Sequence, residues 1–280
     1  MRIDAHQHFW QIAERAGQWP PADLAPIYRD FGPEDLEPLL ATAGFEGTVL
    51  VQTMEREADT AHMLGLATRH PFIKAVVGWT DLKAPDAADA VARLASHPRL
   101  KGLRPMLQDI AQDDWITDPA LAPAIEAMIA HDLAFDALVM PRHLRPLLDL
   151  ATHYPALRIV IDHGAKPPIA EGHISRWRAD LAALAALPNV WCKLSGLLTE
   201  AGGRGPVAVR PYAETLLDLF GPGRLIFGSD WPVLRLAGDY AGWVEQCRDI
   251  VPREHHDAVF GGNAVTFYRL DGITPAADAA

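Results

Sequence analysis

Short apolar runs alternate with helix-like segments along the whole chain. Most runs are continuously apolar rather than alternating, which is typical of parallel strands buried on both faces. Helix boundaries fall between them: Pro33 and Asp118-Pro119 suit first turns, and Gly44, Gly221 and Gly223 stand where helices should end. The expected strands are residues 2–6, 47–52, 75–81, 100–106, 134–139, 158–163, 190–195 and 224–230.

Eight strands in strand–helix order favour an α/β fold, a single (β/α)8 TIM barrel over residues 1–273, with its active site at the C-terminal ends of the strands. The alternative is a doubly wound open sheet, which usually carries a Gly-rich phosphate loop after its first strand. His6-Gln7-His8 occupies that place instead. Residues 274–280 are small and polar, and we expect them to form a disordered tail.

Composition narrows the possible partners. The net charge is -11 and no basic patch stands out, so a nucleic-acid partner is not expected. No signal peptide is visible and the apolar runs are too short for a membrane span, so no membrane partner is expected. Cys192 and Cys247 are the only cysteines, which fits a reducing cytoplasm. The sequence carries no signal for an oligomeric state.

Candidate chemistry gathers where the first and last strands end. His6 and His8 are two residues apart and therefore point to the same side of a strand. Asp230 ends the last strand within Gly228-Ser229-Asp230-Trp231-Pro232. First and last strands are neighbours in a closed barrel, so two imidazoles and a carboxylate should converge. Such a cluster can bind a divalent metal or activate water.

Other polar residues lie at the ends of the remaining strands. They are Gln52, Trp79, Asp81, Arg104, Gln108, Asp136, Asp162, His163, Lys166, Lys193 and Ser195. Some of them should be structural, because a buried charge is normally paired. Lys193 could form a buried ion pair with Asp136 or Asp162, Asp162 could instead cap a helix, and Trp79 could pack in the core.

A site for two metals lacks two of its parts. Lys101, which could carry a carboxylated bridge, begins its strand, and Arg104 stands nearer the mouth. The fifth strand offers Phe135-Asp136-Ala137, with no histidine. The residues therefore predict one divalent ion or none, and no nucleotide cofactor.

Several segments, taken together, resemble a known family. They are Ile3-Asp4-Ala5-His6-Gln7-His8-Phe9-Trp10, Val49-Leu50-Val51-Gln52, Val77-Gly78-Trp79, Lys101-Gly102-Leu103-Arg104-Pro105-Met106, Ile161-Asp162-His163, Cys192-Lys193-Leu194-Ser195-Gly196, Gly228-Ser229-Asp230-Trp231-Pro232 and Phe260-Gly261-Gly262-Asn263-Ala264. The chain resembles the amidohydrolase superfamily in its amidohydrolase 2 branch, and in particular the sugar-lactone hydrolases typified by L-fuconolactonase and L-rhamnonolactonase.

The resemblance implies a (β/α)8 barrel that hydrolyses the cyclic ester of a sugar acid. It carries the catalytic roles, and the ligands of a single divalent ion such as Zn²⁺ where one is present, onto His6, His8, His163 and Asp230. Some members of the branch work without metal, so both alternatives stay open. Asp230 is the candidate general base. Without metal, protonated imidazoles and Arg104 would stabilise the oxyanion.

The expected substrate contacts follow from the chemistry of a polyhydroxylated ring, which suits amides, cations and aromatic faces. They are Gln52, Trp79, Arg104, Lys166 and Lys193. The loops 9–28 and 197–211 should choose among sugars that differ by one methyl group or one stereocentre.

Four other functions compete with this hypothesis. Arg104 would suit the carboxylate of an aromatic acid in a metal-dependent non-oxidative decarboxylase, or of a carboxylated lactone. A barrel that binds without turnover would be expected to lack the acid on the last strand or the first histidine pair, and both are present. Amide hydrolysis is a harder reaction, and the missing parts of a second metal site argue against it.

Overall fold

Eight parallel strands form one sheet in the order in which they occur along the chain, in a computed structural model that describes residues 1–15 and 17–271. The strands are β1 (Ile3–Gln7), β2 (Gly47–Val51), β3 (Ile73–Gly78), β4 (Leu100–Leu103), β5 (Ala134–Ala137), β6 (Ile159–Ile161), β7 (Val190–Leu194) and β8 (Leu225–Phe227). Backbone hydrogen bonds from Asp230 N to His6 O and from His8 N to Trp231 O, both 2.8 Å, join the last strand's extension to the first. The predicted (β/α)8 barrel is confirmed.

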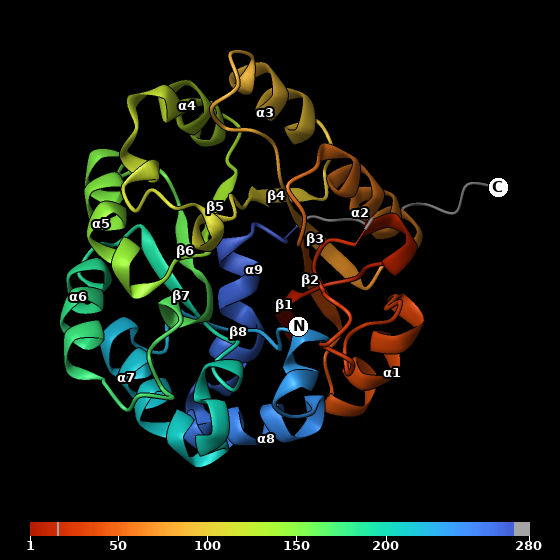
Figure 1. Cartoon of the computed structure of the whole chain (residues 1–280), viewed down its shortest axis with the longest axis vertical. Coiled ribbons are helices and arrows are strands. Elements are labelled where there is room, and N and C mark those ends of the chain that lie inside the picture. Colours follow the sequence, from red (N-terminus) through yellow and green to blue (C-terminus); the bar gives the residue numbers. More distant parts are fainter. Residues whose placement is uncertain (16, 272–280) are drawn as a thin grey trace.

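Helices surround the ring of strands and one further helix lies across its centre (Figure 1). They are α1 (Pro33–Ala43), α2 (Glu57–Arg69), α3 (Ala87–Ala95), α4 (Ala122–Ala130), α5 (Leu144–His153), α6 (Ser175–Ala185), α7 (Arg210–Phe220), α8 (Tyr240–Ile250) and α9 (Asn263–Phe267). As predicted, α1 begins at Pro33 and ends before Gly44, which has a φ of 76°. None of the described helices has the length and apolar character needed to span a membrane.

Two hydrophobic cores hold these layers together. The larger one lies between strands and outer helices and includes Leu50, Phe135 and Trp243. The smaller one fills the barrel with short or branched side chains such as Ala5 and Val160, and it is continued by Phe267 and Tyr268 at the end of α9. Helix α9 lies at the barrel end opposite the strand C-termini, where the guanidinium of Arg158, just before β6, lies 5.6 Å from the centre of the Phe267 ring.

Most observed strands end two or three residues before their predicted ends. Strand β8 stops at Phe227, whereas the prediction ran to residue 230, and β3 stops at Gly78 rather than 81. The reason is conformational, because the polar residues that follow leave the sheet: Asp230 has a φ of 59° and His163 one of 54°. The predicted tail, 274–280, lies outside the described residues.

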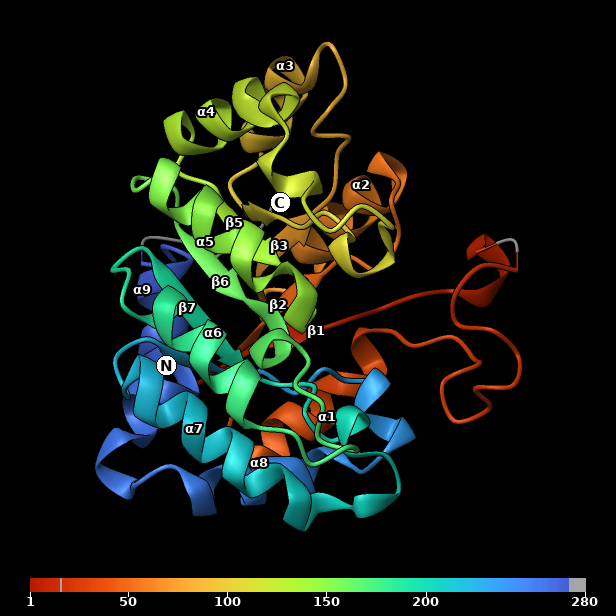
Figure 2. The same ribbon diagram turned by 60° about the vertical axis from the view of Figure 1, so that its left-hand side comes forward.

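The long loop after β1 is tied at its base. Trp10 and Phe31 exchange two backbone hydrogen bonds of 3.0 and 2.9 Å, and their rings pack edge to face at 5.5 Å. Between them the chain extends away from the barrel (Figure 2). Arg15 donates one hydrogen bond within the loop, to Trp19 O, and one to Thr53 Oγ1, which joins the loop to the segment after β2. The Trp10–Phe31 pair and the Arg15–Thr53 hydrogen bond together place the loop beside the barrel mouth.

Candidate active site

His6, His8 and Asp230 meet where β1 adjoins the segment after β8. Asp230 Oδ1 lies 3.8 Å from His6 Nε2 and 3.2 Å from His8 Nε2. His163, after β6, brings its Nε2 to 3.9 Å from the same oxygen. All four side chains are buried. The structure thus brings together the four predicted catalytic residues, which we call the pocket-floor cluster.

The Gly228-Ser229-Asp230 sequence is explained by close packing against β1. A Cβ on Gly228 would lie 2.6 Å from the Cβ of His6, so only glycine fits there. Asp4 Oδ1 accepts a hydrogen bond of 2.8 Å from Ser229 N, and its Oδ2 accepts one of 3.0 Å from Tyr240 OH. Burial raises the pKa of Asp4 to about 6. Asp4 therefore fixes the segment that carries Asp230.

A left-handed turn positions His163. The residues from His163 to Lys166 all have positive φ angles between 48° and 63°. A left-handed conformation costs roughly 1–2 kcal/mol for each non-glycine residue, so the turn has to be held by its surroundings. His163 Nδ1 lies 2.9 Å from Ser195 Oγ, and a Cβ on Gly196 would come within 2.4 Å of that nitrogen. Gly196 leaves the space that the imidazole occupies.

The electrostatics favour neutral imidazoles beside an ionised carboxylate. Burial lowers the pKa of His6 and His8, and it lowers that of His163 to about 4. Burial alone would raise the pKa of Asp230, but His163 and His8 outweigh it and hold that pKa below its ordinary range. The protonated imidazoles expected for a metal-free reaction are therefore disfavoured. A cation beside the cluster remains, because Arg104 Nη1 lies 3.4 Å from His6 Nε2.

The pocket-floor cluster fits a divalent ion. His8 Nδ1 lies 2.7 Å from Val51 O, and because a carbonyl can only accept, this nitrogen carries the proton. Nε2 of a neutral His8 therefore turns a lone pair toward Asp230 Oδ1, 3.2 Å away. Two lone pairs at this distance repel unless a proton or a metal ion lies between them. Ligand atoms about 2.0–2.1 Å from a tetrahedral Zn²⁺ are separated by a similar distance.

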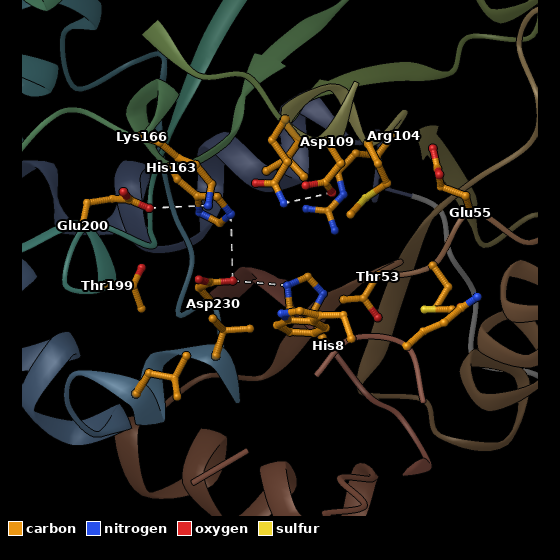
Figure 3. Close-up of a pocket in the computed structure, with 18 of the residues that line it drawn as sticks. His8, Thr53, Glu55, Arg104, Asp109, His163, Lys166, Thr199, Glu200 and Asp230 are labelled. Carbon is orange, nitrogen blue, oxygen red and sulfur yellow. Dashed lines mark hydrogen bonds and ion pairs between the residues drawn. The ribbon is translucent and has the colours of Figure 1, made fainter. Parts of the chain in front are cut away.

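A cavity of about 700 Å³ opens above the cluster. Figure 3 shows Asp230 between His8 and His163, with Lys166 and Glu200 on one side and Thr53 and Glu55 on the other. The lining residues are His8, Gln18, Trp19, Thr53, Met54, Glu55, Arg56, Arg104, Met106, Gln108, Asp109, Leu138, His163, Lys166, Thr199, Glu200, Asp230, Val233 and Leu236. The cavity is therefore polar on its floor and partly apolar on its walls.

The predicted substrate contacts divide into two groups. Arg104 and Lys166 line the cavity, and Lys166 Nζ lies 3.4 Å from Glu200 Oε1. Gln52, Trp79 and Lys193 are not among the described residues that line it. Gln52 Nε2 instead donates a hydrogen bond of 2.6 Å to Arg104 O, and the half-buried Trp79 is held through its backbone by Thr60.

Lys193 belongs to a second buried group, which we call the barrel-interior cluster: Asp136, Asp162, Lys193 and Tyr268. Lys193 Nζ lies 2.5 Å from Asp136 Oδ2 and 2.9 Å from Asp162 Oδ1. Tyr268 OH donates a hydrogen bond of 2.6 Å to Asp136 Oδ2. All four residues are fully buried. The expected buried ion pair of Lys193 is thus present, and the suggestion that Asp162 caps a helix is wrong, because this carboxylate pairs with cations.

The two loops expected to choose the sugar both reach the cavity. Gln18 and Trp19 come from the first, and Thr199 and Glu200 from the second. Sequence reasoning missed Glu55 and Asp109, which line the cavity together with Arg104. Their position in the sequence could have indicated them, because active-site residues of a barrel follow the strand ends and Glu55 comes four residues after the end of β2.

Comparison with known proteins extends over nearly the whole chain. A family model described as amidohydrolase matches residues 3–270. The chain is 58% identical to an L-fucono-1,5-lactonase of Burkholderia ambifaria, with 96% of each chain covered. It is 37% identical to an L-fucono-1,5-lactonase of Burkholderia multivorans, again with 96% of each covered. A crystal structure of a Burkholderia multivorans amidohydrolase with bound zinc has 38% identity and a TM-score of 0.88, covering 96% of this chain and 99% of that one.

Proposed function

The chain belongs to the amidohydrolase family, and from this premise we propose that it hydrolyses the lactone ring of a sugar acid, with L-fucono-1,5-lactone as the first candidate. The 58% identity to a curated lactonase over 96% of both chains carries the proposal. The pocket-floor cluster beneath a cavity of about 700 Å³ supports it, because a monosaccharide lactone fits such a space.

Hydrolysis requires a base for the attacking water and a cation for the carbonyl oxygen. Asp230 Oδ1 is the proposed base, since its carboxylate is ionised and lines the cavity. Arg104 also lines the cavity and is the proposed partner of the developing oxyanion. Protonated Asp230 would then return its proton to the ring oxygen as the carbon–oxygen bond breaks. One carboxyl can serve both half-steps.

Asp230 would need assistance to deprotonate the attacking water, because an ionised carboxylate is a weak base toward ordinary water. We propose that His6, His8, His163 and Asp230 hold one divalent ion, with Zn²⁺ the first candidate, which would lower the pKa of a bound water. The facing lone pairs of His8 and Asp230 support this proposal.

The remaining polar wall would recognise the sugar. Lys166 and Glu200 form an ion pair at one side of the cavity, and their free hydrogen-bonding positions suit hydroxyl groups. Trp19, Val233 and Leu236 offer apolar contacts. The aromatic-acid decarboxylase is not favoured, because both curated lactonases match almost the full chain. The two buried free thiols, Cys192 and Cys247, support an expectation that the enzyme works in the cytoplasm.

A pH-indicator assay of the purified protein against a lactone panel tests the proposal. We expect acid release from L-fucono-1,5-lactone, with lower rates for rhamnono-, arabinono- and galactonolactones. Metal content is measured on the same sample, and the assay is repeated after chelation, which should slow turnover. No acid release from any neutral lactone, or CO₂ release from aromatic acids instead, would overturn the proposal.

A further inference from the structure

Two groups of possible metal ligands share His6. One comprises His6, His8 and Asp230, and the other comprises His6, Asp162 and His163. The two groups have similar residue types and burial, but they differ in how closely lysine and arginine side chains approach their carboxylates. In the second group both carboxylate oxygens of Asp162 are already matched: Lys193 Nζ lies 2.9 Å from Oδ1, and Arg104 Nη1 lies 3.2 Å from Oδ2.

Lys193 occupies a position surrounded by atoms that would also suit a metal ion. Its Nζ lies 2.5 Å from Asp136 Oδ2, 2.9 Å from Asp162 Oδ1 and 3.1 Å from His6 Nδ1. The ammonium donates a hydrogen bond to Asp136 Oδ2 and forms an ion pair with Asp162 Oδ1. The two carboxylates are also ligands that divalent transition metals accept.

We propose that Lys193 acts as a built-in cation that takes the place of a second metal ion and so limits the site to one ion. The balance of buried charge agrees with this role. The carboxylates Asp136, Asp162 and Asp230 face the cations Lys193 and Arg104, which leaves one negative charge for a divalent ion at the pocket floor. Removal of the ammonium would leave Asp136 without a cation and Asp162 with Arg104 alone. A buried unpaired charge is strongly disfavoured.

The test is metal binding by Lys193→Ala, compared with the unaltered chain and with Tyr268→Phe. Each protein is incubated with excess Zn²⁺ or, separately, Mn²⁺, passed through a desalting column, and analysed for metal per chain. We expect at most one ion per chain in the unaltered protein and one more in Lys193→Ala. Anomalous diffraction at the zinc edge should place the additional ion beside Asp136 and Asp162. Tyr268→Phe removes another partner of Asp136 but keeps the ammonium, so it should gain no ion.

Every outcome bears on the role of Lys193 and none depends on the enzyme's activity. A folded Lys193→Ala protein with unchanged metal content would overturn the proposal, as would a second ion in the unaltered cluster or in Tyr268→Phe. If Lys193→Ala does not fold in metal-free buffer, it is refolded with Zn²⁺. Refolding that requires the ion supports the proposal, and a chain that stays unfolded contradicts it, because the ion should then replace the lost charge.

Discussion

The pocket-floor cluster and the barrel-interior cluster are both buried and both charged, yet only the first contributes side chains to the cavity. In the barrel interior, Lys193 Nζ pairs with Asp136 and Asp162, and Tyr268 OH donates to Asp136. At the pocket floor, His8 Nε2 and Asp230 Oδ1 face each other and the cavity. Burial and charge are thus common to both clusters, and the difference lies in whether the charged side chains reach the cavity.

Among substitutions that distinguish the two clusters, Asp230→Asn should have the largest effect, and that effect should be on the reaction rate. The amide keeps the shape of the side chain but cannot accept a proton from water, so kcat should fall about 10³-fold or more. Lactone hydrolysis measured by acid release checks the rate. Circular dichroism and thermal unfolding check the fold, which should be unchanged. Activity within a few-fold of the unaltered enzyme would remove Asp230 from the mechanism.

A substitution in the barrel-interior cluster should lower the stability of the fold. Lys193→Met leaves Asp136 without its cation, and breaking a buried pair in this way should lower the free energy of unfolding by about 3–5 kcal/mol. Adding Asp136→Asn removes the uncompensated charge and should recover part of that loss. Urea unfolding of the two single variants and the double variant measures the coupling. Strictly additive losses would mean that the two side chains do not stabilise each other.

Asp4 connects the two strands on which the pocket floor rests, and its stability contribution depends on pH. Its pKa of about 6 exceeds the ordinary value of 3.8, so the folded chain holds this proton more tightly than the unfolded chain. Stability from Asp4 is therefore full below pH 3.8 and is lost as the pH rises through 6, by roughly 3 kcal/mol at most. His163 acts in the opposite direction, since its lowered pKa favours the fold as the pH rises from about 4.

Comparison with Asp4→Asn isolates this contribution. The difference in unfolding free energy between the unaltered chain and Asp4→Asn, measured in urea from pH 4 to 8, should decline up to about pH 6 and then become constant. Because His163 is present in both proteins, its opposing contribution cancels. A difference that does not change with pH would show that Asp4 has the same proton affinity in the folded and unfolded states.

The sequence was sufficient for the barrel and for the centre of the site, because both depend on strand order and strand ends. His6, His8 and Asp230 could be located since adjacent strands must bring their ends together. The direction in which a long side chain points could not be predicted in this way. Lys193 is one residue from the end of β7, and only packing decides that its amine turns into the barrel rather than toward the cavity.

The cavity residues that the sequence did not predict lie in the loops between strands and helices. In these loops the pattern of apolar positions does not indicate where a side chain points. Glu55 and Asp109 reach the cavity from segments after β2 and β4, and their place depends on how those segments fold back over the mouth. The left-handed turn from His163 to Lys166 is a related case. Its histidine was predicted, but the backbone that aims it is imposed by tertiary packing against local preference.

Gly196→Ala would test how closely the pocket floor depends on that packing. The added Cβ would come within 2.4 Å of His163 Nδ1 at a residue whose φ is 62°, so the imidazole has to shift. A displacement of about 1 Å at a catalytic group can cost 10²-fold, and we expect kcat/KM to fall by about that factor. Gly203→Ala is the matched control, because a Cβ there meets no atom within 4 Å. If both variants retain full activity, the position of His163 is not critical, and the catalytic part of the cluster reduces to β1 and Asp230.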